Sequence, residues 1–301
     1  MWGETTMADN ALRRRTLVQG AAWTVPVIAL AQAAPALAAS GEPPCTTASP
    51  VDVLWKPNAP QYTYTRTGNT QGQLVVTGTG WISPVTVTFA STLVGSALQY
   101  GNLGVSYPTS NQYYTALPLS PEGNLGVLDG TTEPGAGHTI EAGQYFLAFK
   151  QSSIGNDPGD GSQYQEITVS FSEPVNGLNF YVHMIDALWT NYNMFEVAPY
   201  KHYNDRLTIT SATTYTATPT GPAYVSGTGS TSSPLRGDLK FVYALPPQYV
   251  WGNNSAIVQF ADGLTSFTMR FWNAWPSSAT DPLAEQSFYL GEMTFAPSAC
   301  A

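Results

Sequence analysis

Ile167-Thr168-Val169-Ser170-Phe171 decides the fold class of this chain, because apolar and polar side chains alternate along it without a break. A period of two places successive side chains on opposite faces of an extended strand, whereas a helical stripe repeats every 3.6 residues. The same alternation recurs at Val51, Val53 and Trp55, at Val85, Val87 and Phe89, and at Leu178, Phe180, Val182 and Met184. The pattern predicts strands that bury one face.

Further strands are expected between turn clusters of Gly, Pro, Asn, Asp and Ser, at residues 74–77, 145–150, 207–211, 239–245, 256–261, 267–271 and 287–295. So many half-buried strands require a two-layer sandwich or a closed barrel, and we favour an all-β, antiparallel two-layer β-sandwich. In the last strand Phe288 and Leu290 share one parity and Met293 and Phe295 the other. This change of phase predicts a bulge at Gly291-Glu292.

The first 38 residues read as an export signal. Arg14 and Arg15 precede a moderately apolar run that ends in Ala36-Leu37-Ala38, which resembles a bacterial twin-arginine leader with a signal-peptidase site. Pro26, Gln32 and Pro35 interrupt the run, leaving it shorter than the roughly 20 apolar residues of a membrane span. A retained anchor is the alternative. We expect a leader at 1–38, a linker at 39–50 and one sandwich domain at 51–301 with a loop-rich lobe near 93–143.

Composition constrains the partners. Three of the 11 basic and two of the 20 acidic residues lie in the expected leader, so the remainder has a net charge of −10 (8 − 18). An acidic surface repels phosphates and anionic lipids, which argues against nucleic acid as a partner. No second long apolar stretch follows the leader, so no transmembrane span is expected in the mature chain.

Cys45 and Cys300 are the two cysteines of the chain. In a protein that leaves the reducing cytoplasm, a disulfide between them is the natural expectation. A loop of this length is worth on the order of 5 kcal/mol in the chain-entropy account. Two free thiols or a lipidated Cys45 are the alternatives.

Several segments together resemble secreted actinobacterial surface proteins that are exported by the twin-arginine route. They are the run from Ile167 to Phe180, Met184-Ile185-Asp186, Tyr203-Asn204-Asp205-Arg206-Leu207, Gly227-Thr228-Gly229 and Gly291-Glu292-Met293-Thr294-Phe295. The resemblance covers roughly Tyr164 to Cys300 and implies a jelly-roll-like sandwich with no established chemistry. The chain departs from the pattern at Met184, where an Asp is expected.

Two groups of carboxylates are candidate calcium ligands, because Ca²⁺ prefers hard oxygen donors. Asp186 and Asp205 flank the segment 187–204, and Asp157 and Asp160 lie in a Gly-rich turn without the spacing of an EF-hand loop. The alternative is that each Asp accepts backbone N–H bonds that fix its own turn. No cofactor is expected, with calcium as the candidate exception.

Catalytic patterns are weak in this sequence. His138, His183 and His202 do not form H-E-x-x-H, and no serine sits in G-x-S-x-G. His183 has the parity opposite to Val182 and Met184, which predicts a surface histidine. We therefore expect a protein that is not an enzyme, with a secreted hydrolase as the third alternative.

Aromatic side chains offer another candidate surface, since sugar-binding modules stack flat rings on sugar faces. The candidates are Trp189, Tyr192, Tyr200, Trp251 and Trp272, with ordinary packing as the alternative. We expect an interaction or structural module, secreted or at the cell surface, that binds an extracellular or cell-surface macromolecule. A carbohydrate-binding module for polysaccharide, assisted by calcium, is the second hypothesis.

Replacing Arg14 and Arg15 with lysine should leave uncleaved protein inside the cell, because the twin-arginine route reads the paired guanidinium groups. The measurement is an immunoblot of cell and medium fractions. Normal secretion of the double variant would exclude this route.

Overall fold

The computed structural model describes residues 48–100, 123–129, 138–139, 144–153, 155–185, 187–188, 203–222, 224–238, 249–250, 254–276 and 286–298. They belong to one compact unit, Cys45–Ala301. The expected leader, linker residues 39–47 and both cysteines lie outside the described residues, so the leader and the disulfide stay predictions.

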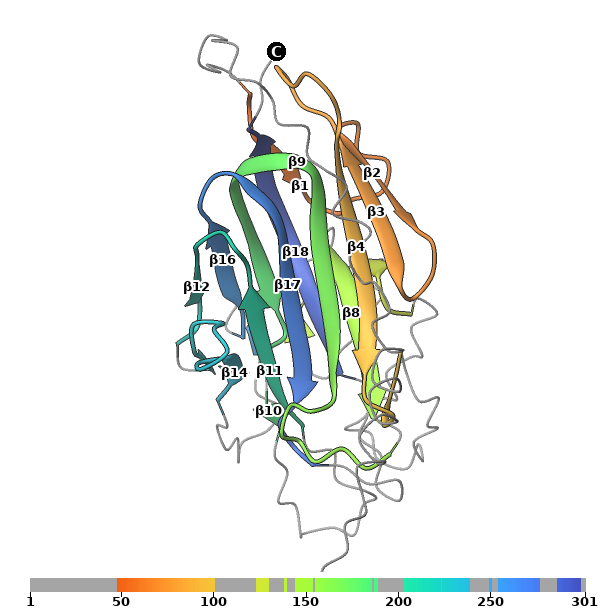
Figure 1. The fold of residues 1–301 in the computed structure, drawn as a ribbon, viewed down its shortest axis with the longest axis vertical. Coiled ribbons are helices and arrows are strands. Elements are labelled where there is room, and N and C mark those ends of the chain that lie inside the picture. Colours follow the sequence, from red (N-terminus) through yellow and green to blue (C-terminus); the bar gives the residue numbers. More distant parts are fainter. Residues whose placement is uncertain are drawn as a thin grey trace, which may run out of the picture. The chain divides into compact units, whose positions relative to one another are not determined.

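The described residues form strands and no helices (Figure 1). The strands are β1 (Val51–Val53), β2 (Tyr62–Arg66), β3 (Gln71–Val76), β4 (Val85–Val94), β5 (Leu98–Tyr100), β6 (Gly126–Asp129), β7 (His138–Thr139), β8 (Tyr145–Ser153), β9 (Tyr164–His183), β10 (Ala187–Leu188), β11 (Tyr203–Thr210), β12 (Tyr215–Pro219), β13 (Val225–Ser226), β14 (Leu235–Gly237), β15 (Tyr249–Val250), β16 (Ala256–Phe260), β17 (Leu264–Asn273) and β18 (Gln286–Pro297).

Strand β9 belongs to both layers of the sandwich. Its first half lies between β4 and β17, with Val169 opposite Phe89 and Phe267. Its second half lies between β16 and β18, with Val182 opposite Ala256 and Leu290. The strand bends over at Pro174–Gly177, where Gly177 has a φ of 63° that favours glycine. The bend is the arch at the top of Figure 1.

Each half of β9 organises one sheet. The first sheet has the order β2-β3-β4-β9-β17-β11-β14-β13, and in the second sheet β9 lies between β16 and β18, which continue to β12 and to β8 respectively. Strands β5 and β6 both pair with β8, and β1 pairs with β18. Every pairing in these sheets is antiparallel, while β7 and β15 form a separate parallel pair. The all-β, antiparallel two-layer sandwich expected from the sequence is confirmed.

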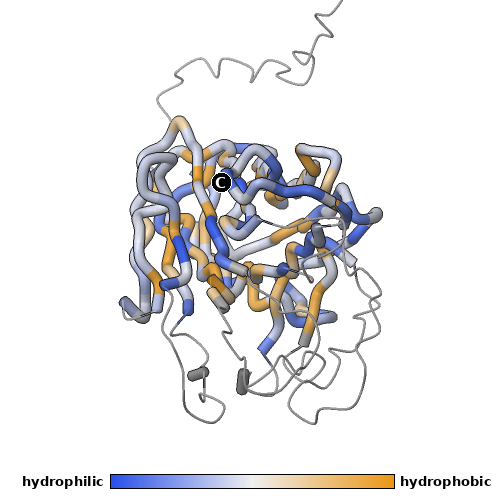
Figure 2. Tube along the Cα trace, turned by 90° about the horizontal axis from the view of Figure 1, so that it is seen from below, coloured by the Kyte–Doolittle hydropathy of each residue, from blue (hydrophilic) through white to orange (hydrophobic). Residues whose placement is uncertain are grey.

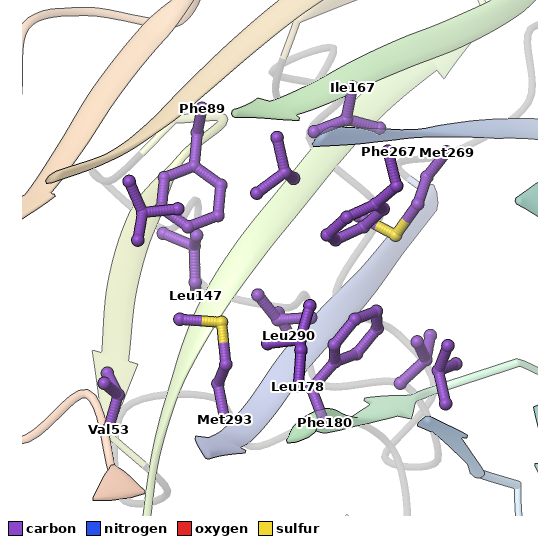
Figure 3. Close-up of a cluster of buried hydrophobic side chains, with 14 of the residues drawn as sticks. Val53, Phe89, Leu147, Ile167, Leu178, Phe180, Phe267, Met269, Leu290 and Met293 are labelled. Atoms are coloured by element: carbon purple, nitrogen blue, oxygen red, sulfur yellow. The ribbon is translucent and has the colours of Figure 1, made fainter. Parts of the chain in front are cut away.

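The main core fills the space between the two sheets. Phe89, Ile167, Phe267 and Met269 from the first sheet point toward Leu147, Phe180, Leu290 and Met293 from the second (Figure 3). All of these side chains are at most 2% exposed. Figure 2, seen from below, shows hydrophobic residues distributed over strands throughout the domain.

The bulge predicted at Gly291-Glu292 is confirmed. Leu290 pairs with Val182 and Met293 with Phe180, so β18 carries one extra residue here. The Trp55 indole N–H donates to the carbonyl oxygen of Gly291 at 2.7 Å. Trp55 is buried and has a φ of 58°, a left-handed conformation that a bulky residue seldom adopts. This bond therefore fixes the bulge from the β1 side.

The other strand predictions agree with the structure at residues 74–76, 145–150, 207–210, 256–260, 267–271 and 287–295. The expected strand at 239–245 lies outside the described residues. Most of the expected lobe near 93–143 does too, although β4 reaches Val94 and β5, β6 and β7 fall within it. Alternation missed β2, β5 to β7, β10 and β12 to β15, each of which has five residues or fewer.

The prediction that His183 lies on the surface is wrong. Its side chain is 8% exposed, because the outward face of β8, β9 and β18 carries a second hydrophobic cluster of Leu128, Phe146, Ala148 and Tyr289. The imidazole stacks on Tyr181, contacts Phe146 edge-on and bonds Ser255 Oγ through Nδ1 at 2.7 Å. A side chain at Gly291 would collide with the imidazole Nε2. Burial lowers the pKa of His183 from 6.5 to about 4.

We expect acid destabilisation that depends on His183. The neutral ring stabilises the fold above pH 6.5, and this contribution is lost as the pH falls toward about 4, because the unfolded chain binds the proton first. The shift corresponds to about 3 kcal/mol. Urea unfolding of the parent and His183→Gln between pH 7 and 4 measures it. Equal pH slopes for the two proteins would contradict the prediction.

Candidate functional site

The inner face of the sandwich turns polar at the end drawn lowest in Figure 1. There the inward positions that carry Phe or Ile further along each strand carry buried polar residues: Ser91 on β4, Gln151 on β8, Gln165 on β9, Asp205 on β11, Asn273 on β17 and Gln286 on β18. Asn124 joins them from the residues before β6. This set is called the inner polar layer below.

Direct bonds connect the members of the inner polar layer. Gln286 donates to Asp205 Oδ1 at 3.0 Å, and Gln165 donates to Asn124 Oδ1 at 2.7 Å and to Ser91 Oγ at 2.9 Å. Within the described part of the chain, three buried polar atoms of this layer have no partner: Gln151 Oε1, Gln165 Oε1 and Asn273 Nδ2. Asp205 therefore faces the interior, where it orders the ends of β11 and β18.

The outer face of the first sheet carries a different row at the same end. Arg206 on β11 lies directly opposite Arg236 on β14 and Trp272 on β17. Leu207 and Leu235, the neighbours of the two arginines, are fully buried, so both arginines lie on the outer face. Three adjacent strands thus present Arg236, Arg206 and Trp272 side by side.

A cavity of about 160 Å³ adjoins this row. It is lined by Arg206, Gly227, Ser232, Ser233, Pro234 and Arg236, and is called the arginine cavity below. Burial, and to a smaller extent the charge of Arg236, lower the pKa of Arg206. The negative charges of Asp205 and Asp238 partly offset this decrease. The cavity therefore combines two cationic groups with serine hydroxyls.

A shallow groove of about 630 Å³ lies on the other side of the same hairpin loop, residues 227–234 between β13 and β14. It is lined by Ser211, Ala212, Thr213, Thr214, Tyr215, Thr216, Ala217, Thr228 and Ser230, and is called the hydroxyl groove. Backbone bonds hold the hairpin loop: Ile209 donates to Gly229 at 2.7 Å, and Thr228 to Ser233 at 2.9 Å. A side chain at Gly227 would collide with the carbonyl oxygen of Pro234.

The structure brings few of the sequence-predicted site residues together. Asp186, Trp189, Tyr192, Tyr200 and Trp251 lie outside the described residues, as do Cys45 and Cys300. Trp272 is half-buried, and a Cβ atom on Gly161 would lie 3.2 Å from its indole ring. The turn at 157–161 therefore packs against this tryptophan.

Asp157 and Asp160 each accept a backbone N–H bond from two residues ahead, Gly159 at 2.9 Å and Ser162 at 2.9 Å. Burial, and to a smaller extent the charge of Asp160, raise the pKa of Asp157, while the bonds from Ser162 lower that of Asp160. Within the described part of the chain, no three His, Cys, Asp or Glu side chains gather as metal ligands. Each carboxylate has a backbone partner without a metal ion, and the calcium site stays a prediction.

The sequence gives no sign that Arg206 and the segment from Gly227 to Gly229 lie beside Arg236. Alternation along a strand places Arg206 on the face opposite to Leu207, and Arg236 on the face opposite to Leu235. The register of β11 against β14 makes them neighbours, and no local pattern encodes that register.

Comparison with protein-family models gives no match, and no curated protein matches the chain. A solved structure, the adhesin domain of PrgB from Enterococcus faecalis, is similar over 78% of this chain and 69% of its own length. The sequence identity is 9% and the TM-score is 0.36. A likeness this weak bears on neither the ligand nor the role of this chain.

A search of the described residues finds no helix with the length and hydropathy of a membrane span.

Replacing Asp157 with Asn should raise the thermal midpoint at pH 7. The amide keeps the oxygen that Gly159 needs and removes a charge whose burial opposes folding, as the raised pKa indicates. The gain should vanish below pH 3.8, where the carboxyl is protonated in both states. Calorimetry of both proteins checks this. Asp160→Asn, on the exposed part of the same turn, is the control and should not show the gain.

Proposed function

We propose that this protein is an exported, non-enzymatic interaction module whose sandwich presents the hairpin loop 227–234 to an extracellular or cell-surface macromolecule. One observation carries the proposal: a single backbone-bonded loop contributes hydroxyl side chains to two neighbouring hollows, the arginine cavity and the hydroxyl groove. Convergent polar groups on a rigid scaffold are the usual composition of a recognition surface.

The rigidity of this face supports binding over chemistry. A Cβ atom on Gly229 would lie 3.4 Å from the Ala217 side chain and 3.5 Å from that of Ile209, so the hairpin loop packs closely against β11 and β12. A preformed face loses little conformational entropy when a partner docks. The groups around the groove are mainly Ser and Thr hydroxyls, which donate and accept hydrogen bonds and carry no charge.

A carbohydrate-binding module is the second candidate, and the position of Trp272 favours it. The indole lies on the outer face directly opposite Arg206, so an aromatic ring borders the arginine row. Stacking on such a ring and hydroxyl bonding in the groove are both typical of sugar recognition. Polysaccharides are therefore the first partners to test.

Filling the hydroxyl groove should weaken binding. Ala212 is exposed and lines the groove, so Ala212→Trp should occupy the space and lower retention on the responsive polymer by roughly tenfold, a change of about 1.4 kcal/mol. The measurement is depletion of the mature protein by a panel of insoluble polysaccharides and by surface-exposed wall material from bacteria.

Ile82→Trp is the matched control. Ile82 is 60% exposed and lies before β4, outside the groove, so this variant adds the same ring without blocking the site. Equal retention of both variants, or passage of the parent through every material, would contradict the proposed function.

A further inference from the structure

The two arginines that line the arginine cavity are an electrostatic cost to the sheet. Arg206 and Arg236 are directly paired across β11 and β14, and like charges in this relation are destabilising. A pair of neutral polar side chains would serve the sheet as well on its outer face. The two arginines therefore require negative charge nearby to offset their repulsion.

The described residues supply only part of that charge. Arg236 donates to Ser226 Oγ at 2.8 Å and lies 3.6 Å from Asp238, whose carboxylate also accepts a bond from Ser226. Arg206 donates to Asn204 Oδ1 and, at 3.0 Å, to the carbonyl oxygen of Asp205, and neither acceptor carries a charge. Among the described residues Arg206 forms no other hydrogen bond.

The nearest carboxylate to Arg206 in sequence, Asp205, compensates its charge only in part and from the other face of the sheet. The Asp205 side chain has inward parity, is 2% exposed and accepts a bond from Gln286 in the inner polar layer. Among the described residues, Arg236 thus has a carboxylate in ion-pair distance, whereas Arg206 has hydrogen bonds to two neutral oxygens and no ion pair.

We propose that the arginine cavity binds a single carboxylate carried by a sugar unit, a uronic acid within an otherwise neutral polysaccharide. The inference rests on the proposed function and names its ligand class. A guanidinium fork matches the two oxygens of a carboxylate, and Ser232 and Ser233 add hydroxyl donors at the same wall.

Charge decides between kinds of anion. Arg206 is the one arginine of the cavity without an ion pair among the described residues, and a single such guanidinium balances a monoanion better than a phosphate dianion. The chain as a whole has a net charge of −9, which repels a polyanion at long range. Isolated carboxylates on a neutral polymer meet both conditions. The hydroxyl groove beyond the hairpin loop then receives the neutral sugars, which favours a glycan over an acidic peptide.

The test is a titration of the folded mature protein with glucuronate, with glucose as its neutral counterpart and with inorganic phosphate. The readout is the ¹H–¹⁵N signal of the arginine Nε–H groups. Glucuronate should shift the signals of Arg206 and Arg236 with a Kd on the order of millimolar, weakening as salt is added. Glucose should need at least roughly tenfold higher concentration for the same shift.

Variants separate the site from general charge. Arg206→Gln and Arg236→Gln should each abolish the glucuronate response, whereas Arg270→Gln should keep it. Arg270 is the matched control because its side chain is 51% exposed against 55% for Arg236, while its partner is Glu166 at 2.8 Å. Near-ultraviolet circular dichroism verifies that each variant is folded.

Three outcomes would overturn the inference: equal responses to glucuronate and glucose, tighter binding of inorganic phosphate than of glucuronate, or equal loss in Arg270→Gln. The proposed function is judged separately. If glucuronate fails while a polymer retains the parent and releases Ala212→Trp, the module stands and the carboxylate ligand falls.

Discussion

The pairing of β9 with four other strands is the constraint on which the rest of the structure depends. Its first half hydrogen-bonds β4 and β17 and its second half β16 and β18, so one strand holds the two layers in a fixed relation. Bonds at the bend reinforce this: Gly177 donates to Asp262 at 3.0 Å, Gly263 to Asn176 at 3.0 Å and Ser298 to the Pro174 carbonyl at 2.8 Å. A slip of one residue in either half would turn every core side chain of that half toward water.

The same register positions both polar features at the lower end. Gln165 at the start of β9 is opposite Phe271 on β17, and the next residue of β17, Trp272, is opposite Arg206 on β11. The inner polar layer and the outer arginine row are therefore two faces of the same few strand ends. The strands that carry the two arginines are held in place by Leu207 and Leu235, which are fully buried on the inner face, and this fixes the position of the arginine cavity.

Sequence predicted what is local and missed what depends on register. Alternation at Ile167, Val169 and Phe171 was sufficient for the sandwich, and the change of parity after Leu290 located the bulge. The prediction that His183 is exposed was wrong, because alternation indicates which face a residue occupies and not whether a second hydrophobic cluster covers that face. The inner polar layer could have been found by extending each inward parity by one step, as from Ile167 back to Gln165. The Arg206–Arg236 pair could not, since neither β13 nor β14 has enough apolar residues to be recognised as a strand.

At this end of the sandwich, the buried polar residues of the inner face and the paired arginines of the outer face are both unfavourable for stability, but they are compensated to different degrees. In the inner polar layer the polar groups satisfy one another: Gln286 bonds Asp205, and Gln165 bonds Asn124. They replace hydrophobic contacts with an ordered network, in which three atoms have no partner among the residues that the structure describes. In the outer row, Arg206 bonds only two neutral oxygens among the described residues, Asn204 Oδ1 and the Asp205 carbonyl, and the carboxylates of Asp205 and Asp238 compensate its charge only in part. Folded proteins retain such unrelieved features mainly where a partner completes them. Selection for stability alone would remove the Arg206–Arg236 pair, whereas selection for binding would retain it. The outer row is therefore a better candidate for a binding surface than the buried network.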